Sequence, residues 1–104
     1  MVVGNSMAPA IKEGDLIIFK PYDQYKSKLL IGDIVIAKNP LKGNQLIIKR
    51  ISKKDVYGVE LLGDNEYLST DSRHFGLINY KELVGIVDRI IPRSTKIIKS
   101  IAQE

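Results

Sequence analysis

Apolar residues recur along this chain in short runs rich in isoleucine and valine. The runs are LIIF (16–19), DIVIA (33–37), QLIIKRI (45–51), VYGVELL (56–62) and ELVGIVDRII (82–91). Turn-forming residues bound each run, as in KEGD, NPLKGN and GDN. Short β-branched runs separated by turns are typical of an antiparallel β protein. The pattern therefore predicts a mainly β fold of five or six strands.

Two segments outside these runs favour helical structure. The segment APAIKEG places Pro9 near a first turn and Gly14 as a stop, which predicts a short helical turn directly after Ser6. In the tail, residues 92–104, isoleucines recur at helical spacing. The tail is therefore expected to form a C-terminal helix or to remain loose.

Length and composition indicate one domain. A chain of 104 residues with 44% hydrophobic residues is sufficient for a single compact core, and no linker divides it. We therefore expect a single minimal domain over residues 1–104. No run approaches the roughly 18 apolar residues of a membrane span, and the N-terminus has no signal-peptide pattern. These features predict a cytoplasmic protein without a transmembrane segment, provided that Met1 is the true start.

Charge and residue inventory exclude several kinds of site. The net charge of +4 is spread along the chain rather than gathered in a basic run. No basic and aromatic stacking platform is evident among 5 Tyr and 2 Phe, which argues against nucleic-acid binding. With no cysteine and one histidine, the chain lacks a disulfide and a cysteine or histidine metal cluster. No metal or other cofactor is expected.

The same inventory leaves more than one hydrolytic arrangement open. A Ser-His-Asp triad would have to use His74, which has Asp64 and Asp71 nearby in the sequence. The two aspartates could also form a carboxylate pair, although acidic residues in turn-rich segments usually cap backbone amides. Neither pattern is specific.

A lysine in the run QLIIKRI is the stronger candidate. Strand alternation places Lys49 on one face with Ile47 and Ile51, and Ile48 and Arg50 on the other. Burial on an apolar face lowers a lysine pKa by up to several units from about 10.4. A neutral amine beside a serine hydroxyl can accept its proton and activate it as a nucleophile. The alternative is that Lys49 extends to solvent from an edge strand while Arg50 pairs with an acid.

Four boxes, in order along the chain, resemble the signal peptidase I family. GNSMAP (4–9) is similar to its nucleophile box, GDIVIAKNP (32–40) to its Gly-Asp strand and LIIKRI (46–51) to its Lys-Arg strand. GDNEYLSTDSRHFG (63–76) resembles the most diagnostic segment of that family. A Ser-Met box with a distant lysine would equally fit the self-cleaving repressor peptidases. The last segment favours the signal peptidase I family.

This resemblance implies roles for particular residues. Ser6 would be the nucleophile, with its backbone N–H donating to the oxyanion, and Lys49 would be the general base. Ser69 would hydrogen-bond the lysine amine and orient it. Asp71 and Arg73 would form an ion pair that braces the loop carrying Ser69.

The resemblance also bears on the residues around the nucleophile. Met7 and Pro9 would shape the turn and, with Ile47, would contact the substrate. Many members of the family have a serine two residues before the nucleophile, as a second oxyanion donor. That position holds Gly4 here. A backbone amide near Gly4 or Asn5 would have to substitute, or turnover would fall on the order of a hundredfold.

The implied fold is a coiled antiparallel sheet that closes towards a small barrel, with a substrate peptide laid as an extra strand beside the dyad. Small chains of this type resemble the nickel-type superoxide dismutase maturation proteases. Such an enzyme would remove a short N-terminal leader from a protein precursor, and the nickel would belong to that substrate. The alternatives are a signal-peptidase-like or repressor-like peptidase with another substrate, a non-catalytic peptide-binding relative, and a nucleic-acid-binding β-barrel.

Overall fold

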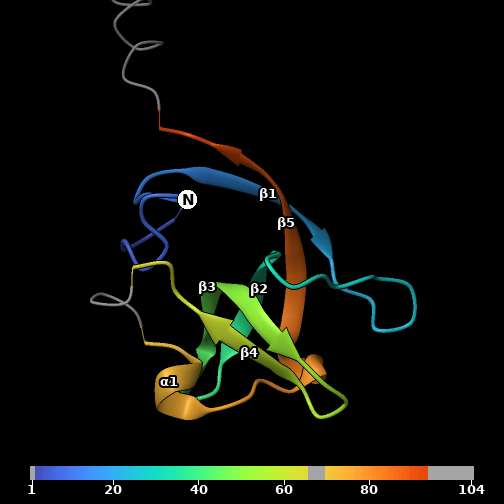
Figure 1. Cartoon of the computed structure of the whole chain (residues 1–104). Helices are drawn as coiled ribbons and strands as arrows, with labels where there is room; N and C mark the ends of the chain where they lie inside the picture. The colour runs from blue at the N-terminus through green and yellow to red at the C-terminus, as the bar shows by residue number, and fades with distance from the viewer. Residues whose placement is uncertain (1, 66–69, 94–104) are drawn as a thin grey trace, which may run out of the picture.

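The computed structural model describes residues 2–65 and 70–93, which contain a five-stranded antiparallel sheet and little helix (Figure 1). The strands are β1 (Leu16–Pro21), β2 (Ile34–Asn39), β3 (Lys42–Lys54), β4 (Val59–Leu62) and β5 (Leu83–Ile91). Their order across the sheet is β1-β5-β2-β3-β4. The predicted mainly β fold is confirmed, and each predicted apolar run overlaps one of the strands.

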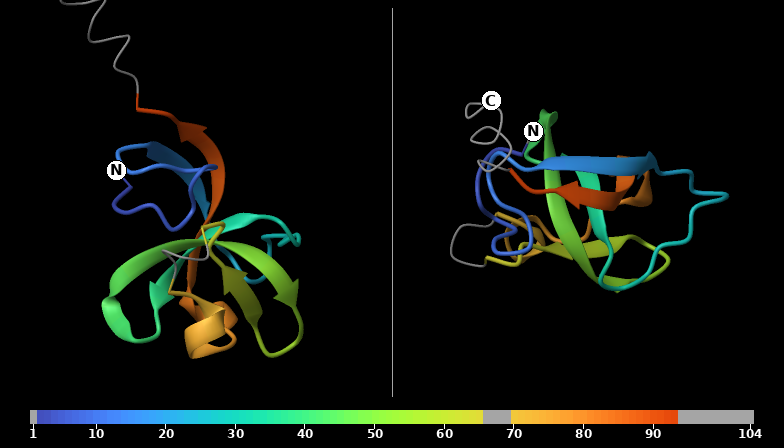
Figure 2. Two further views of the ribbon diagram at one scale, coloured as in Figure 1. Left: turned by 60° about the vertical axis from the view of Figure 1, so that its left-hand side comes forward. Right: turned by 90° about the horizontal axis from the view of Figure 1, so that it is seen from above.

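The sheet is open, because its edge strands β1 and β4 do not pair with each other in the described part of the chain. Strand β5 pairs with β2 through its first residues, from Leu83 to Ile86, and with β1 from Gly85 to Ile91. The β1–β5 ribbon therefore stands away from the β2–β4 layer (Figure 2). The expected closure into a barrel is wrong, since strand order leaves β1 and β4 at opposite edges.

The core has two clusters. The larger one lies over the β2–β4 layer and consists of Leu29, Val35, Ala37, Ile51, Val59, Leu61, Ile78 and Leu83. The smaller one is formed by the N-terminal segment, in which Val2, Met7 and Ile11 are buried. It packs against isoleucines of both parts of the sheet: Ile17 and Ile90 from the β1–β5 ribbon, and Ile34 and Ile48 from β2 and β3. This packing fixes the segment that carries Ser6 against the sheet.

Helical structure is limited. The segment after Ser6 forms hydrogen-bonded turns, with the Ile11 N–H donating to the Met7 carbonyl at 3.0 Å, and thus agrees with the predicted short helical turn. A one-turn helix, α1 (Ser72–Phe75), and a 3-10 turn, η2 (Tyr80–Glu82), were not predicted. The expected C-terminal helix lies outside the described residues. Within the described ranges, no helix is long and apolar enough to cross a membrane.

Candidate active site

Ser6 lies in the turn between the chain start and β1, and its neighbours hold it in place. Met7, which follows it, is only 1% exposed within the smaller core cluster. The Ser6 carbonyl accepts a hydrogen bond from the Asn65 N–H at 2.8 Å. Gly4 adopts a φ of 82°, a left-handed conformation that costs glycine little. The hydroxyl is thus held beside the sheet by packing on one side and a backbone bond on the other.

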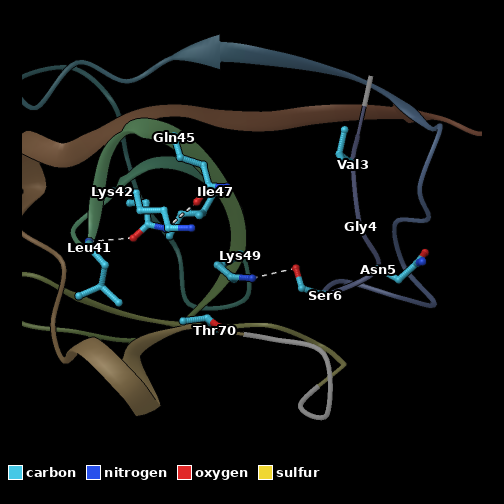
Figure 3. A pocket seen from close by; sticks show the side chains of 11 residues that line it. Val3, Gly4, Asn5, Ser6, Leu41, Lys42, Gln45, Ile47, Lys49 and Thr70 are labelled. Carbon is cyan, nitrogen blue, oxygen red and sulfur yellow. Dashed lines mark hydrogen bonds between the residues drawn. The ribbon is translucent and has the colours of Figure 1, made fainter.

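Lys49 lies in the middle of β3, opposite Val35 of β2. Its residue is 4% exposed and the adjacent same-face Ile51 is 1% exposed, which confirms the predicted dry face. The Nζ atom donates a hydrogen bond to Ser6 Oγ at 2.8 Å, and Figure 3 shows the two side chains directed toward each other. Residues 43 positions apart in the sequence therefore form a serine–lysine pair.

The surroundings of Lys49 lower the pKa of its amine. Burial lowers the pKa of Lys49 from its usual value of 10.5, because an ammonium loses solvation in an apolar environment. The Asp71 carboxylate opposes this effect and raises the pKa, whereas Arg73 lowers it. Since burial is the largest influence, the amine loses its proton below pH 10.5.

Asp71 and Arg73 form the predicted ion pair beneath the site. Asp71 is fully buried, and its Oδ2 accepts from Arg73 Nη2 at 2.6 Å while Oδ1 accepts from Arg73 Nε at 2.9 Å. Oδ2 also accepts from the Gly63 N–H at 2.7 Å, which ties α1 to the end of β4. His74 completes a reciprocal cap of α1, because its Nδ1 accepts from the Asp71 N–H. Ser69 lies outside the described residues.

The hydrogen bonds of the described residues do not assemble the other two candidate arrangements, the carboxylate pair and the Ser-His-Asp triad. Asp64 accepts from Arg50 Nε at 2.9 Å and from Arg50 Nη2 at 2.8 Å, so Arg50 pairs with an acid as the strand pattern allowed. Asp64 and Asp71 thus pair with different arginines rather than with each other, and His74 caps a helix instead of meeting Ser6. Within residues 2–65 and 70–93, no group of three potential metal ligands is present.

A pocket of about 380 Å³ opens beside the serine–lysine pair (Figure 3). Its lining consists of Val3, Gly4, Asn5, Ser6, Asn39, Leu41, Lys42, Gln45, Ile47, Lys49 and Thr70. Ile47, predicted to contact substrate, is among them. Met7 and Pro9 are not, because Met7 points into the smaller core and Pro9 belongs to the following turn. The pocket therefore extends from the dyad toward the β2–β3 hairpin.

Glu13 is an unpredicted neighbour of the nucleophile segment. Its Oε1 accepts from the Gly4 N–H at 3.2 Å, and its own N–H donates to Asn5 Oδ1 at 3.1 Å. Figure 3 shows the Asn5 side chain directed away from Ser6 and Lys49. These bonds engage the Gly4 backbone N–H and the Asn5 side-chain oxygen Oδ1 with Glu13. Such a link depends on tertiary contact and leaves no local sequence signal.

Replacing Asp71 with asparagine is expected to destabilise the protein by about 2–3 kcal/mol, because it leaves Arg73 without its buried carboxylate. It should also move the alkaline rise of any Lys49-dependent activity to lower pH, since the carboxylate that raises the Lys49 pKa is gone. Urea denaturation and a pH–rate profile measure the two effects. Asp64→Asn is the matched control: its ion pair is partly exposed, so less than about 1 kcal/mol is expected. Equal effects of Asp71→Asn and Asp64→Asn would contradict the assignment of Asp71 as the buried partner of Arg73 and as the carboxylate that raises the Lys49 pKa.

Replacing Gly4 with alanine is expected to cost about 1 kcal/mol, because an L-residue is strained at a φ of 82° although the surrounding space is open. Denaturant titration measures this change. Gly43→Ala is the control, since its added Cβ also meets nothing within 4 Å and its φ is not left-handed. An unchanged unfolding midpoint in Gly4→Ala would show that the turn before Ser6 relaxes without strain.

Comparisons with known proteins identify a family of peptidases. The family model described as Peptidase S24-like matches residues 1–87. The chain is 31% identical over 107 residues to the mitochondrial ATP-independent inner membrane protease subunit 1a of Arabidopsis thaliana, covering 81% of this chain and 64% of that protein. It is 34% identical over 100 residues to the mitochondrial inner membrane protease subunit 1 of Mus musculus, covering 77% and 60% respectively. The chain thus spans less than two thirds of the length of either relative.

No solved structure matches significantly. The matches to protease sequences support the general expectation of a signal-peptidase-like peptidase. Maturation of a nickel-type superoxide dismutase stays a prediction.

Proposed function

Since the chain belongs to the Peptidase S24-like family, we propose that it is a serine endopeptidase with a Ser6–Lys49 dyad. The observation that carries this proposal is the 2.8 Å hydrogen bond between Lys49 Nζ and Ser6 Oγ. The low exposure of Lys49 adds to it, because burial lowers the pKa of the amine, as a general base requires.

In the proposed reaction, the neutral Lys49 amine accepts the Ser6 hydroxyl proton as Oγ attacks the carbonyl carbon of the scissile peptide bond. The tetrahedral intermediate collapses when the Lys49 ammonium returns a proton to the leaving amine. Ser6 is then esterified by the N-terminal part of the substrate. Lys49 next accepts a proton from the water that attacks the ester, and it returns a proton to Ser6 Oγ as the carboxylic acid product leaves. The observed separation of nitrogen and oxygen is within the range for such a transfer.

The developing oxyanion requires hydrogen-bond donors. We assign the Ser6 backbone N–H to this role, since no acceptor among the described residues pairs with it. The Gly4 N–H already donates to Glu13 and would have to release that exposed bond to contribute. A dyad with one available hydrogen-bond donor to the oxyanion is consistent with slow turnover.

A protein precursor is the substrate class that we propose. Both of these relatives are named as proteases, and the pocket opens along β3, where an extended peptide could lie beside the dyad. Within this class, the sequence resemblance favours the N-terminal leader of a nickel-type superoxide dismutase precursor. The nickel ion would be a component of that substrate.

The proposal is tested by incubating the protein separately with a nickel-type superoxide dismutase precursor and with a generic signal-peptide substrate. Mass spectrometry then identifies the cleavage products. Cleavage of the first substrate at its leader supports the specific proposal, and cleavage of the generic substrate alone assigns a different precursor class. If neither is cut, and Ser6→Ala and Lys49→Ala behave like the wild type, the dyad proposal fails.

A further inference from the structure

The pocket beside Ser6 and Lys49 ends at the β2–β3 hairpin, whose residues have no part in the proposed bond cleavage. Asn39 closes β2, and the chain turns through residues 40 and 41 before β3 begins at Lys42. Asn39, Lys42 and Gln45 all line the pocket. Asn39 is 8% exposed and therefore nearly buried, whereas the other two side chains are open to solvent. We call these three residues, Asn39, Lys42 and Gln45, the polar wall, which forms the end of the pocket away from the dyad.

The orientation of the polar groups on this wall follows from one backbone donor. The Leu41 N–H can only donate, and it donates to Asn39 Oδ1 at 2.8 Å. The Asn39 amide nitrogen is thereby directed to the other side, where Nδ2 donates to Gln45 Oε1 at 2.8 Å. Gln45 must then present its Nε2 group, which has two N–H donors, away from Asn39. Among the described residues no acceptor pairs with this Nε2 group, so the chain of amides ends in an available donor on a residue that lines the pocket.

The charge of the polar wall also favours an acidic ligand. Lys42 adds an ammonium group, and no carboxylate of a described residue pairs with it. None of the described residues that line the pocket is acidic. Lys49, the other basic residue of the lining, lies at the dyad end, where burial lowers its pKa. The hairpin end thus offers N–H donors and a positive charge to whatever enters, and a carboxylate fits this combination best.

We propose that the hairpin end of the pocket is a specificity subsite for an aspartate or glutamate side chain of the substrate, bound by Gln45 Nε2 and the Lys42 ammonium. This inference rests on the proposed peptidase function. Gln45 and Lys49 are four residues apart on β3, or about 13 Å along a strand. An extended substrate covers that distance in about four residues. The acidic residue is therefore expected within about four positions of the scissile bond.

The test uses a synthetic library of peptides with diverse sequences, acetylated at the N-terminus and amidated at the C-terminus so that only side chains supply carboxylates. The wild type and three variants digest it, and mass spectrometry scores enrichment around each cut. Gln45→Glu keeps the bond from Asn39 but replaces the free donor with an acceptor. Lys42→Glu reverses the charge of the wall. Lys38→Glu is the matched control, since Lys38 is exposed on β2 and does not line the pocket.

The wild type should show about tenfold enrichment of Asp and Glu at one position near the cut, typical of a charge-assisted hydrogen bond. Gln45→Glu and Lys42→Glu should abolish or invert that enrichment, and Lys38→Glu should keep it. Cleavage without an acidic preference, or an equal loss in all three variants, would overturn the subsite while leaving the peptidase proposal intact. Failure of the wild type to cut any peptide would overturn the peptidase proposal, and the subsite with it.

Discussion

Replacement of Ser6 by alanine should reduce precursor cleavage by at least about 10⁴-fold, because the variant has no Oγ to form the covalent ester. Binding of the precursor should change little, since the pocket and the polar wall are intact. The loss should therefore appear in kcat rather than in KM. Single-turnover digestion followed by mass spectrometry measures it.

Ser27→Ala is the matched control for Ser6→Ala. Ser27 is also partly buried, and its hydroxyl also makes one local bond, accepting from the Asp23 N–H at 2.8 Å. Ser27 does not line the dyad pocket. Its removal should leave kcat within about twofold, the range expected for a surface serine. Retention of most activity in Ser6→Ala would exclude Ser6 as the nucleophile.

Replacement of Lys49 by methionine should lower kcat by a similar factor, because a nucleophile and its base act as one unit. Methionine preserves the length and the apolar part of the lysine side chain, so it should pack between Ile47 and Ile51. Wild-type activity should rise with pH as Lys49 loses its proton, with a midpoint below 10.5. The residual activity of Lys49→Met should lack that rise. Lys38→Met, on an exposed β2 position, is the control.

The stability of Lys49→Met distinguishes a catalytic base at position 49 from a lysine with a structural role. The folded pKa of Lys49 is lowered, so the unfolded chain binds more protons between that pKa and 10.5, and burial of this lysine opposes folding in full below the folded pKa. That cost diminishes as pH rises from the folded pKa toward 10.5. Lys49→Met should therefore be as stable as the wild type or more stable at pH 7, and its advantage should shrink at alkaline pH. A large loss of stability at pH 7 would indicate a structural role.

Local patterns predicted the dry face around Lys49 and the turn around Ser6, whereas the pairing of the two residues was implied by the resemblance to the signal peptidase I family. Alternation within β3 placed Lys49 between two large apolar residues, and that periodicity alone predicts a dry face. The Gly4 and Pro9 positions around Ser6 indicated a turn before any contact was known. Strand positions followed similarly from short β-branched runs bounded by turn residues.

Features that depend on distant contacts were not predictable in the same way. Closure into a barrel failed because the order of strands is set by which segments pair, and no local pattern encodes that β5 pairs with both β1 and β2. The link from Glu13 to Gly4 and Asn5 arises only after the N-terminal turn folds back. Met7 illustrates the same difficulty, because a large apolar residue beside a nucleophile fits either a pocket or a core.

The polar wall was also missed, although part of its signal is local. An asparagine directly before a two-residue turn that starts with proline favours an Asx-type bond, which fixes the Asn39 oxygen on the Leu41 N–H. The consequence for Gln45 depends on a register shift in the hairpin after Lys38. Such irregularities follow from pairing geometry and not from composition.

The central claim, that Ser6 is the nucleophile and Lys49 its base, is tested most directly by the mass of the acyl-enzyme. The protein is mixed with an activated ester of an N-acetylated peptide, quenched in acid and digested for peptide mapping. The dyad predicts one acyl group on Ser6, formed faster as pH rises toward 10.5, absent in Ser6→Ala and strongly slowed in Lys49→Met. Absence of an acyl group on Ser6, or acylation of Ser6 at an equal rate in Lys49→Met, would contradict it.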